Sequence, residues 1–137
     1  MLNSTKPRGT IAAGALLIFG ACRSDFPCGN TISRRLPSPG GARNAVVFER
    51  GCGAMTSRAG TGVSILEGRD TTLSPPDKGN VYLNDNHPGP DGTRAPTEVQ
   101  VEWSSDTVLV VRQLVGAHVV FAVIKRAGVT VKYDTLR

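Results

Sequence analysis

A series of short valine-rich segments, separated by glycine, proline and small polar residues, most constrains the fold of this 137-residue chain. In the clearest of them, TEVQVEW over residues 97–103, apolar Val99, Val101 and Trp103 alternate with polar residues. Alternation of this kind places apolar side chains on one face of a strand and polar side chains on the other. The segment therefore predicts a β-strand with one face in a core.

The same reasoning extends along the rest of the chain. Valine favours strands because branching at Cβ suits a pleated surface. Glycine and proline clusters, such as PSPGG over residues 37–41, indicate turns between strands. The pattern predicts an all-β fold, an antiparallel meander of about seven or eight short strands that forms a small sandwich, a barrel-like sheet or propeller-blade-like sheets. The expected strands are 31–36, 44–50, 62–67, 80–83, 97–103, 107–113, 119–126 and 129–133.

The first 21 residues differ in character from the rest. Lys6 and Arg8 precede an apolar run from Ile11 to Ala21. This run is too short for a membrane-spanning helix, which needs about 20 apolar residues, but it suits the helical core of a secretory signal. The segment predicts export, in preference to a buried first helix.

The apolar run ends in Phe19, Gly20, Ala21 and Cys22. This ending resembles the bacterial lipobox, although Phe19 stands where leucine is usual. The resemblance implies cleavage before Cys22, lipidation of that cysteine and attachment to a membrane through acyl chains. We therefore expect a signal peptide over residues 1–21, a tether over 22–29 and a single β-domain over 30–137. The alternative is cleavage nearby by the ordinary signal peptidase, which would release a free secreted protein.

The sequence contains three cysteines, Cys22, Cys28 and Cys52. If Cys22 carries lipid, the other two remain as a pair in an oxidising compartment, where disulfides persist. A Cys28–Cys52 disulfide would close a loop of about 25 residues and stabilise the domain by roughly 3–4 kcal/mol. The alternative, Cys52 as a thiol nucleophile, requires an activating base such as His87 or His118, and neither histidine lies in a catalytic motif.

Several of these segments together resemble a family. Ser38–Gly41 (SPGG), residues 45–54 (AVVFERGCGA), residues 63–65 (VSI) and residues 101–103 (VEW) are similar to a pattern close to SPDGK, VFxR, CGAT and VSI. A group of small, uncharacterised bacterial exported proteins and lipoproteins carries that pattern. Gly40 stands where the pattern prefers aspartate, and Met55 is inserted after CGA. The resemblance implies an exported domain and no particular mechanism.

The formal net charge is +5, and Lys6 and Arg8 lie in the segment that we expect to be removed. The other basic residues are scattered, with no basic stripe interleaved with aromatic residues, which a nucleic-acid interface needs. We therefore expect no nucleic-acid partner. The expected partners are a membrane, through the lipid anchor, and a protein or ligand that the sequence does not identify.

Polar residues gather over 84–96, NDNHPGPDGTRAP. Oxygen and imidazole ligands from such a loop suit a cation, but the spacing is not that of an EF-hand and the prolines restrict it. The sequence predicts a solvated surface loop, with Asp85, His87 and Asp91 as the candidate ligands if it binds a metal. No motif indicates a cofactor.

Motifs that would define an enzyme are not found. Thr56 and Ser57 lie outside any nucleophile elbow or phosphate-binding loop, and turn-capping is the more common role of such hydroxyls. We therefore expect a cell-envelope lipoprotein, periplasmic or on the outer surface, with a non-enzymatic structural or interaction domain. The alternatives are a ligand-binding lipoprotein, and a hydrolase or thiol enzyme that uses Cys52 or His87.

Overall fold

The computed structural model describes residues 28–53, 58–74 and 77–136, and in these ranges the chain forms strands and no helix. No membrane-spanning helix is therefore found there. The expected signal peptide and Cys22 lie outside the described residues. The strands are β1 (Cys28–Pro37), β2 (Arg43–Cys52), β3 (Arg58–Glu67), β4 (Tyr82–Asp85), β5 (Val99–Ser105), β6 (Val108–Leu114), β7 (His118–Ala122), β8 (Lys125–Arg126) and β9 (Val129–Leu136).

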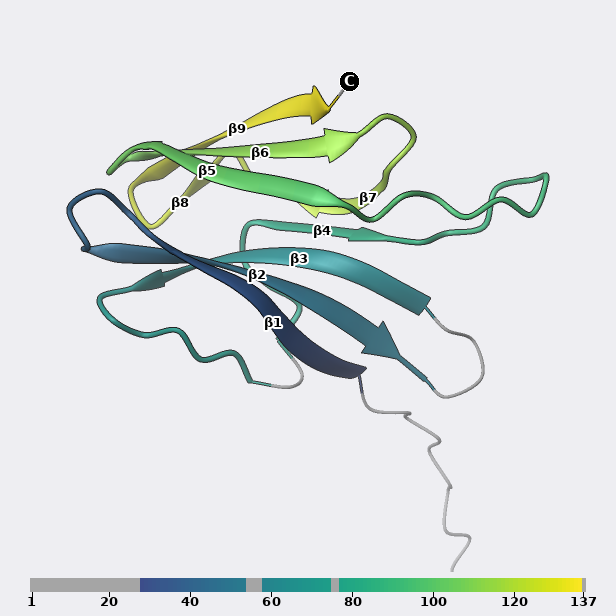
Figure 1. Cartoon of the computed structure of the whole chain (residues 1–137), viewed down its shortest axis with the longest axis horizontal. Coiled ribbons are helices and arrows are strands. Elements are labelled where there is room, and N and C mark those ends of the chain that lie inside the picture. Colours follow the sequence, from purple (N-terminus) through teal and green to yellow (C-terminus); the bar gives the residue numbers. More distant parts are fainter. Residues whose placement is uncertain (1–27, 54–57, 75–76, 137) are drawn as a thin grey trace, which may run out of the picture.

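The strands form two sheets that lie one above the other (Figure 1). One has five strands in the order β1-β2-β3-β4-β7, and the other has four in the order β5-β6-β9-β8. Consecutive strands from β1 to β4 pair antiparallel, as do β5 and β6. The prediction of an all-β fold built from short strands is confirmed, in the form of a small sandwich.

The strand expected over residues 119–126 is divided between the two sheets. β7 pairs with β4 in one sheet, whereas β8 pairs with β9 in the other. Between them the Val123 amide donates to Val81 O, and the Val131 amide donates to Ile124 O. The chain thus crosses between layers inside one valine-rich run. The sequence predicts a single strand here because strand propensity does not show to which sheet each half belongs.

A second difference concerns β6 and β9. These strands pair in parallel, from Val108 opposite Thr130 to Leu114 opposite Leu136. Sequential hairpins would make every pair antiparallel. Because the intervening chain visits the other sheet as β7, it provides the crossover connection that parallel strands need.

The core fills the space between the sheets. β5 contributes Val99 and Val101, as its alternation predicts, while the Trp103 indole is half-buried and donates to Leu36 O over 2.8 Å. Each fully buried aliphatic side chain stabilises the fold by roughly 1.5–3 kcal/mol. The buried cluster consists of Ala45, Val47, Val63, Ile65, Val81, Tyr82, Val99, Val101, Leu109, Val111, Val129 and Val131.

The outer face of the five-stranded sheet is also covered. Phe48 lies on the face of β2 opposite the core, yet it is fully buried. A Cβ at Gly62 would overlap the Phe48 ring, and one at Gly79 would lie 3.0 Å from it. Arg50, on the same face, donates to Asp77 O over 2.8 Å. Part of the polar connection between β3 and β4 therefore packs over this face, and glycine makes room for the ring.

Candidate functional site

Cys28 and Cys52 form a disulfide. They are direct partners in the β1–β2 register, and their Cα atoms lie 4.1 Å apart. A bonded Cys52 has no thiolate, which is the form that thiol catalysis needs. The Cys28–Cys52 bond confirms the disulfide prediction. Thr56 and Ser57, the hydroxyls that follow Cys52, lie outside the described residues.

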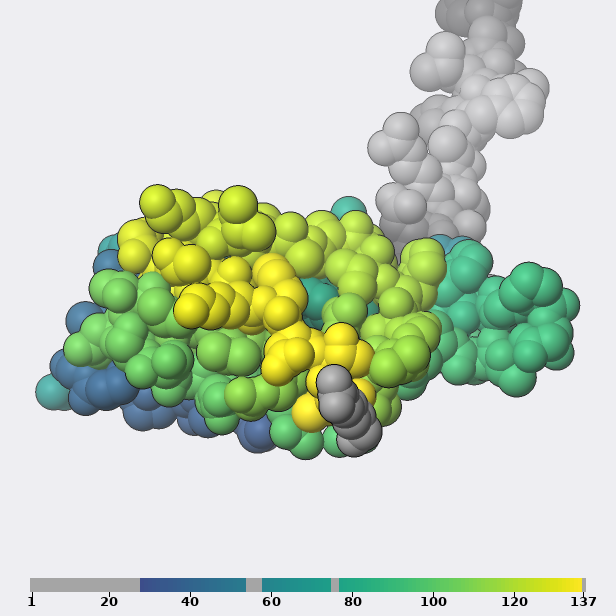
Figure 2. Space-filling view, turned by 90° about the horizontal axis from the view of Figure 1, so that it is seen from above, coloured from purple at the N-terminus to yellow at the C-terminus, as the bar shows by residue number. Residues whose placement is uncertain are grey.

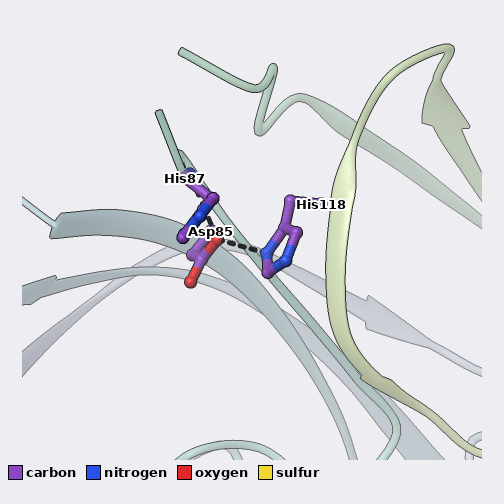
Figure 3. A group of neighbouring side chains, drawn as sticks. All are labelled: Asp85, His87 and His118. Carbon is purple, nitrogen blue, oxygen red and sulfur yellow. Dashed lines mark hydrogen bonds and ion pairs between the residues drawn. The ribbon is translucent and has the colours of Figure 1, made fainter. Parts of the chain in front are cut away.

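The loop after β4 contributes a polar cluster that includes a residue from a distant strand. Asp85 is the last residue of β4 and lies directly opposite His118, the first residue of β7. The His118 ring donates through Nδ1 to Asp85 Oδ1 over 2.7 Å. The two side chains therefore form a cross-strand pair at the edge of the sheet (Figure 3).

His87 completes the cluster from the same loop. Its backbone amide donates to Asp85 Oδ1 over 3.2 Å, and its ring stacks on the His118 ring at a centroid distance of 4.6 Å and an interplanar angle of 23°. The three residues offer ligand atoms that all lie within 4.8 Å of one another. Both histidines of the sequence thus converge on one carboxylate.

Buried Asn84 fixes the position of this cluster. Its side-chain oxygen accepts from the Thr61 amide over 2.8 Å, and its Nδ2 donates to Tyr82 Oη and to Thr97 O, each over 3.2 Å. The β4–β7 register shifts between Leu83 and Asn84. Asn84 therefore ties the end of β4 to β3 and to the chain entering β5, and Asp85 projects next to this fixed point.

Asp91 lies apart from the other predicted ligands. Its Oδ1 accepts from the Thr93 hydroxyl over 2.6 Å and from the Thr93 amide over 3.0 Å, and these hydrogen bonds lower the pKa of the Asp91 carboxyl. Pro88 and Arg94, which flank this turn in the sequence, form an isolated antiparallel bridge. The loop projects from one end of the molecule (Figure 2). The structure thus groups Asp85 and His87 with His118, and it engages Asp91 in a local turn.

Two pockets border the cluster. A pocket of about 350 Å³ is lined by His87 and His118 together with residues of the loop and Gly116. A second, of about 270 Å³, is lined by Asp85, by both disulfide cysteines and by apolar Leu83 and Val120 among others. The side chains of His118 and Asp85 are 50% and 25% exposed, so the cluster can be reached from solvent.

A third pocket, of about 520 Å³, lies where β1 and β2 face β5. Most of its lining residues are polar, including Arg34, Glu49, Glu98 and Arg112. Arg34 spans it partly, since its guanidinium donates to Val99 O over 2.9 Å. The large apolar cavity that the ligand-binding alternative expects is not among these pockets of the described residues.

His118 is the residue that sequence reasoning missed as a member of the cluster. It lies 31 residues beyond His87, at the start of a valine-rich segment, and its role depends on the pairing of β4 with β7. The local pattern predicts both strands but does not indicate that they are neighbours. The available signal was that the sequence holds only two histidines, His118 directly before the predicted strand 119–126 and His87 in the loop that follows the predicted strand 80–83.

The edge of the five-stranded sheet carries a separate feature. β7 is its last strand, and Val119 and Val120 on it are 37% and 50% exposed. Val115 and Ile124, on either side of the strand, are each 76% exposed. Among the described residues these four are the exposed large apolar side chains, and they all lie within ten residues of one another in the chain.

Comparison of the chain with protein-family models, with curated proteins and with solved structures finds no match. The fold and site define a two-sheet β-sandwich with one disulfide and an aspartate–histidine cluster. The resemblance to small bacterial exported proteins stays a prediction.

Proposed function

We propose that this chain is an exported protein of the bacterial cell envelope, that lipid on Cys22 holds it to a membrane, and that its β-sandwich is a non-enzymatic interaction module. The Cys28–Cys52 disulfide carries this proposal, because disulfides persist in oxidising compartments. It also uses two of the three cysteines, which leaves Cys22 of the lipobox-like segment for acylation. Cys28 begins β1, so the domain starts within a few residues of the proposed anchor.

The exposed apolar strand β7 supports the interaction role. An edge strand presents unpaired backbone groups, and soluble proteins usually protect such edges with charged residues or proline. β7 instead carries exposed Val119 and Val120 in the sequence HVVFA. Addition of a strand to a sheet edge is a common mode of peptide recognition, in which backbone hydrogen bonds give affinity and side-chain contacts give specificity. The partner proposed here is an extended segment of another envelope protein.

Mass spectrometry of the mature protein tests the anchor. We expect a chain that begins at a diacylated Cys22 and gains the mass of two hydrogens on reduction. A mature chain that begins at unmodified Met1, or one cleaved without acylation, would overturn the anchoring.

Photo-crosslinking in cells tests the interaction surface. A photo-reactive residue at Val120 should capture one defined envelope protein, whereas the same residue at Lys132, exposed on the other sheet, should not. Introducing Val119→Pro next to the crosslinker should abolish capture, because proline removes a strand hydrogen bond and alters the edge. Equal capture from both positions, or a crosslink only to a second copy of the chain, would contradict the proposal that the β7 edge binds another envelope protein.

A further inference from the structure

We infer that Asp85, His87 and His118 form a binding site for a divalent transition-metal cation, with Zn²⁺ as the probe of choice. Two imidazoles and one carboxylate are a ligand set that suits zinc and its neighbours, whereas calcium and magnesium prefer oxygen ligands throughout. The site does not depend on the anchor or on the partner proposed above.

The ligand atoms already lie close together, and binding requires one ring to rotate. Ligands at about 2.0–2.1 Å in a tetrahedral zinc site lie about 3.4 Å from one another. His118 Nδ1 and Asp85 Oδ1 are 2.7 Å apart, and all three ligand atoms lie within 4.8 Å. A cation between them would replace the Nδ1 proton, which passes to solvent, and widen the His118–Asp85 separation by under 1 Å. The His87 ring must also turn out of its stack on His118, because a cation lies in the plane of the imidazole that binds it and the two stacked rings are only 23° apart.

The surroundings support the site in two ways. Asp85 is held by the β4–β7 register and by neighbouring Asn84, so one ligand is placed before any cation arrives. His87 and His118 face the pocket of about 350 Å³, which leaves space for water to complete the coordination. Three protein ligands with an exchangeable fourth position describe an open zinc site rather than a closed structural one.

Neither cysteine of the described residues competes with these ligands, because Cys28 and Cys52 are bonded to each other. With two histidines in the whole sequence, each imidazole can also be followed individually. A cation bound here must perturb both histidine signals in a proton NMR spectrum, with the same stoichiometry. Adventitious binding at scattered carboxylates would leave both signals unchanged.

The test uses the full chain, exported so that the disulfide forms and carrying no polyhistidine tag. Calorimetric titration with Zn²⁺ should give one site per chain, and NMR should show both histidine signals shifting together. His87→Ala and Asp85→Asn should each weaken Zn²⁺ binding by more than about tenfold, because even the loss of a residue that only supports a metal ligand costs about tenfold. Asp91→Ala is the matched control, since this carboxylate belongs to the same loop but bonds Thr93.

Circular dichroism and the intact mass establish that each variant is folded and disulfide-bonded. Unchanged Zn²⁺ affinity in a folded His87→Ala variant would overturn the site. Equal loss in Asp91→Ala would also overturn it, because the loop as a whole rather than the three ligands would then be responsible. Mg²⁺ should not displace bound Zn²⁺, and displacement at comparable concentrations would contradict the nitrogen ligands.

Discussion

Removal of the Cys28–Cys52 disulfide should lower the free energy of unfolding substantially. The two cysteines are 24 residues apart in the chain. In the chain-entropy model, opening a loop of about 25 residues returns about 12 cal/mol/K to the unfolded state, which is about 3.5 kcal/mol at 25 °C. Small domains are stable by about 5–15 kcal/mol, so the loss is a large share of the total.

Urea unfolding of the Cys28→Ala, Cys52→Ala double variant measures this loss directly. We expect it to be less stable by about 3–4 kcal/mol and to melt roughly 10–20 °C lower than the disulfide-bonded parent. The strands should remain, because β1 and β2 continue to pair from Gly29 to Pro37 without the bond.

Reduction of the parent provides the control, since it removes the same bond without changing the core. The reduced parent and the double variant should agree in stability, and reductant should not affect the variant further. A difference below about 1 kcal/mol between the bonded parent and the variant would refute the reasoning, because the unfolded chain would then already be as restricted as the bonded one.

Two other stability predictions follow from the buried Asn84 amide and the half-buried Tyr133 hydroxyl. Asn84→Ala should destabilise the domain by about 2–4 kcal/mol in urea unfolding, because the Thr61 amide loses its acceptor inside the protein, and a loss below about 1 kcal/mol would contradict this. Burial raises the pKa of Tyr133 to about 12, whereas a tyrosine in the unfolded chain titrates near 10. The unfolded chain therefore loses this proton first as the pH rises. The contribution of the protonated Tyr133 hydroxyl to the free energy of unfolding is complete below about pH 10 and falls as the pH rises toward 12. The urea midpoint of the parent should drop between about pH 9 and pH 11, and Tyr133→Phe should reduce that drop; an equal drop in both would exclude Tyr133 as its source.

The strands could be predicted from sequence because the information for them is local. The alternation of Val99, Val101 and Trp103 predicts which side chains of β5 face the core, and the structure places the two valines there. The Cys28–Cys52 bond could be predicted by counting, since the third cysteine belongs to a segment of different composition. The evidence for β5 lies within a few neighbouring residues, and the evidence for the disulfide lies in the odd number of cysteines.

The pairing of distant strands could not be predicted in this way. Nothing in HVVFA indicates that β7 lies beside β4, and nothing in residues 119–126 indicates that the chain changes sheets at Val123. A strand's period of two defines its faces but not its neighbour. Because His118 joins the cluster only through this pairing, the complete ligand set depends on the fold. Asp91, close to His87 in the sequence, is separated from it by a local turn that satisfies its carboxylate.

The disulfide and the proposed zinc site are connected through the five-stranded sheet. Cys52 lies opposite Arg58 in the β2–β3 register, and Ala59, the next residue, exchanges two hydrogen bonds with Asn86, at 3.1 Å to the side chain and 2.8 Å from the Asn86 amide. Asn86 immediately precedes His87. Loss of the disulfide should therefore loosen this path and weaken Zn²⁺ binding by about tenfold, the lower end of what supporting residues contribute. The double cysteine variant, titrated with Zn²⁺ under conditions where it is fully folded, measures the effect. Unchanged affinity together with the expected loss of stability would show that β4 and β7 alone position the ligands.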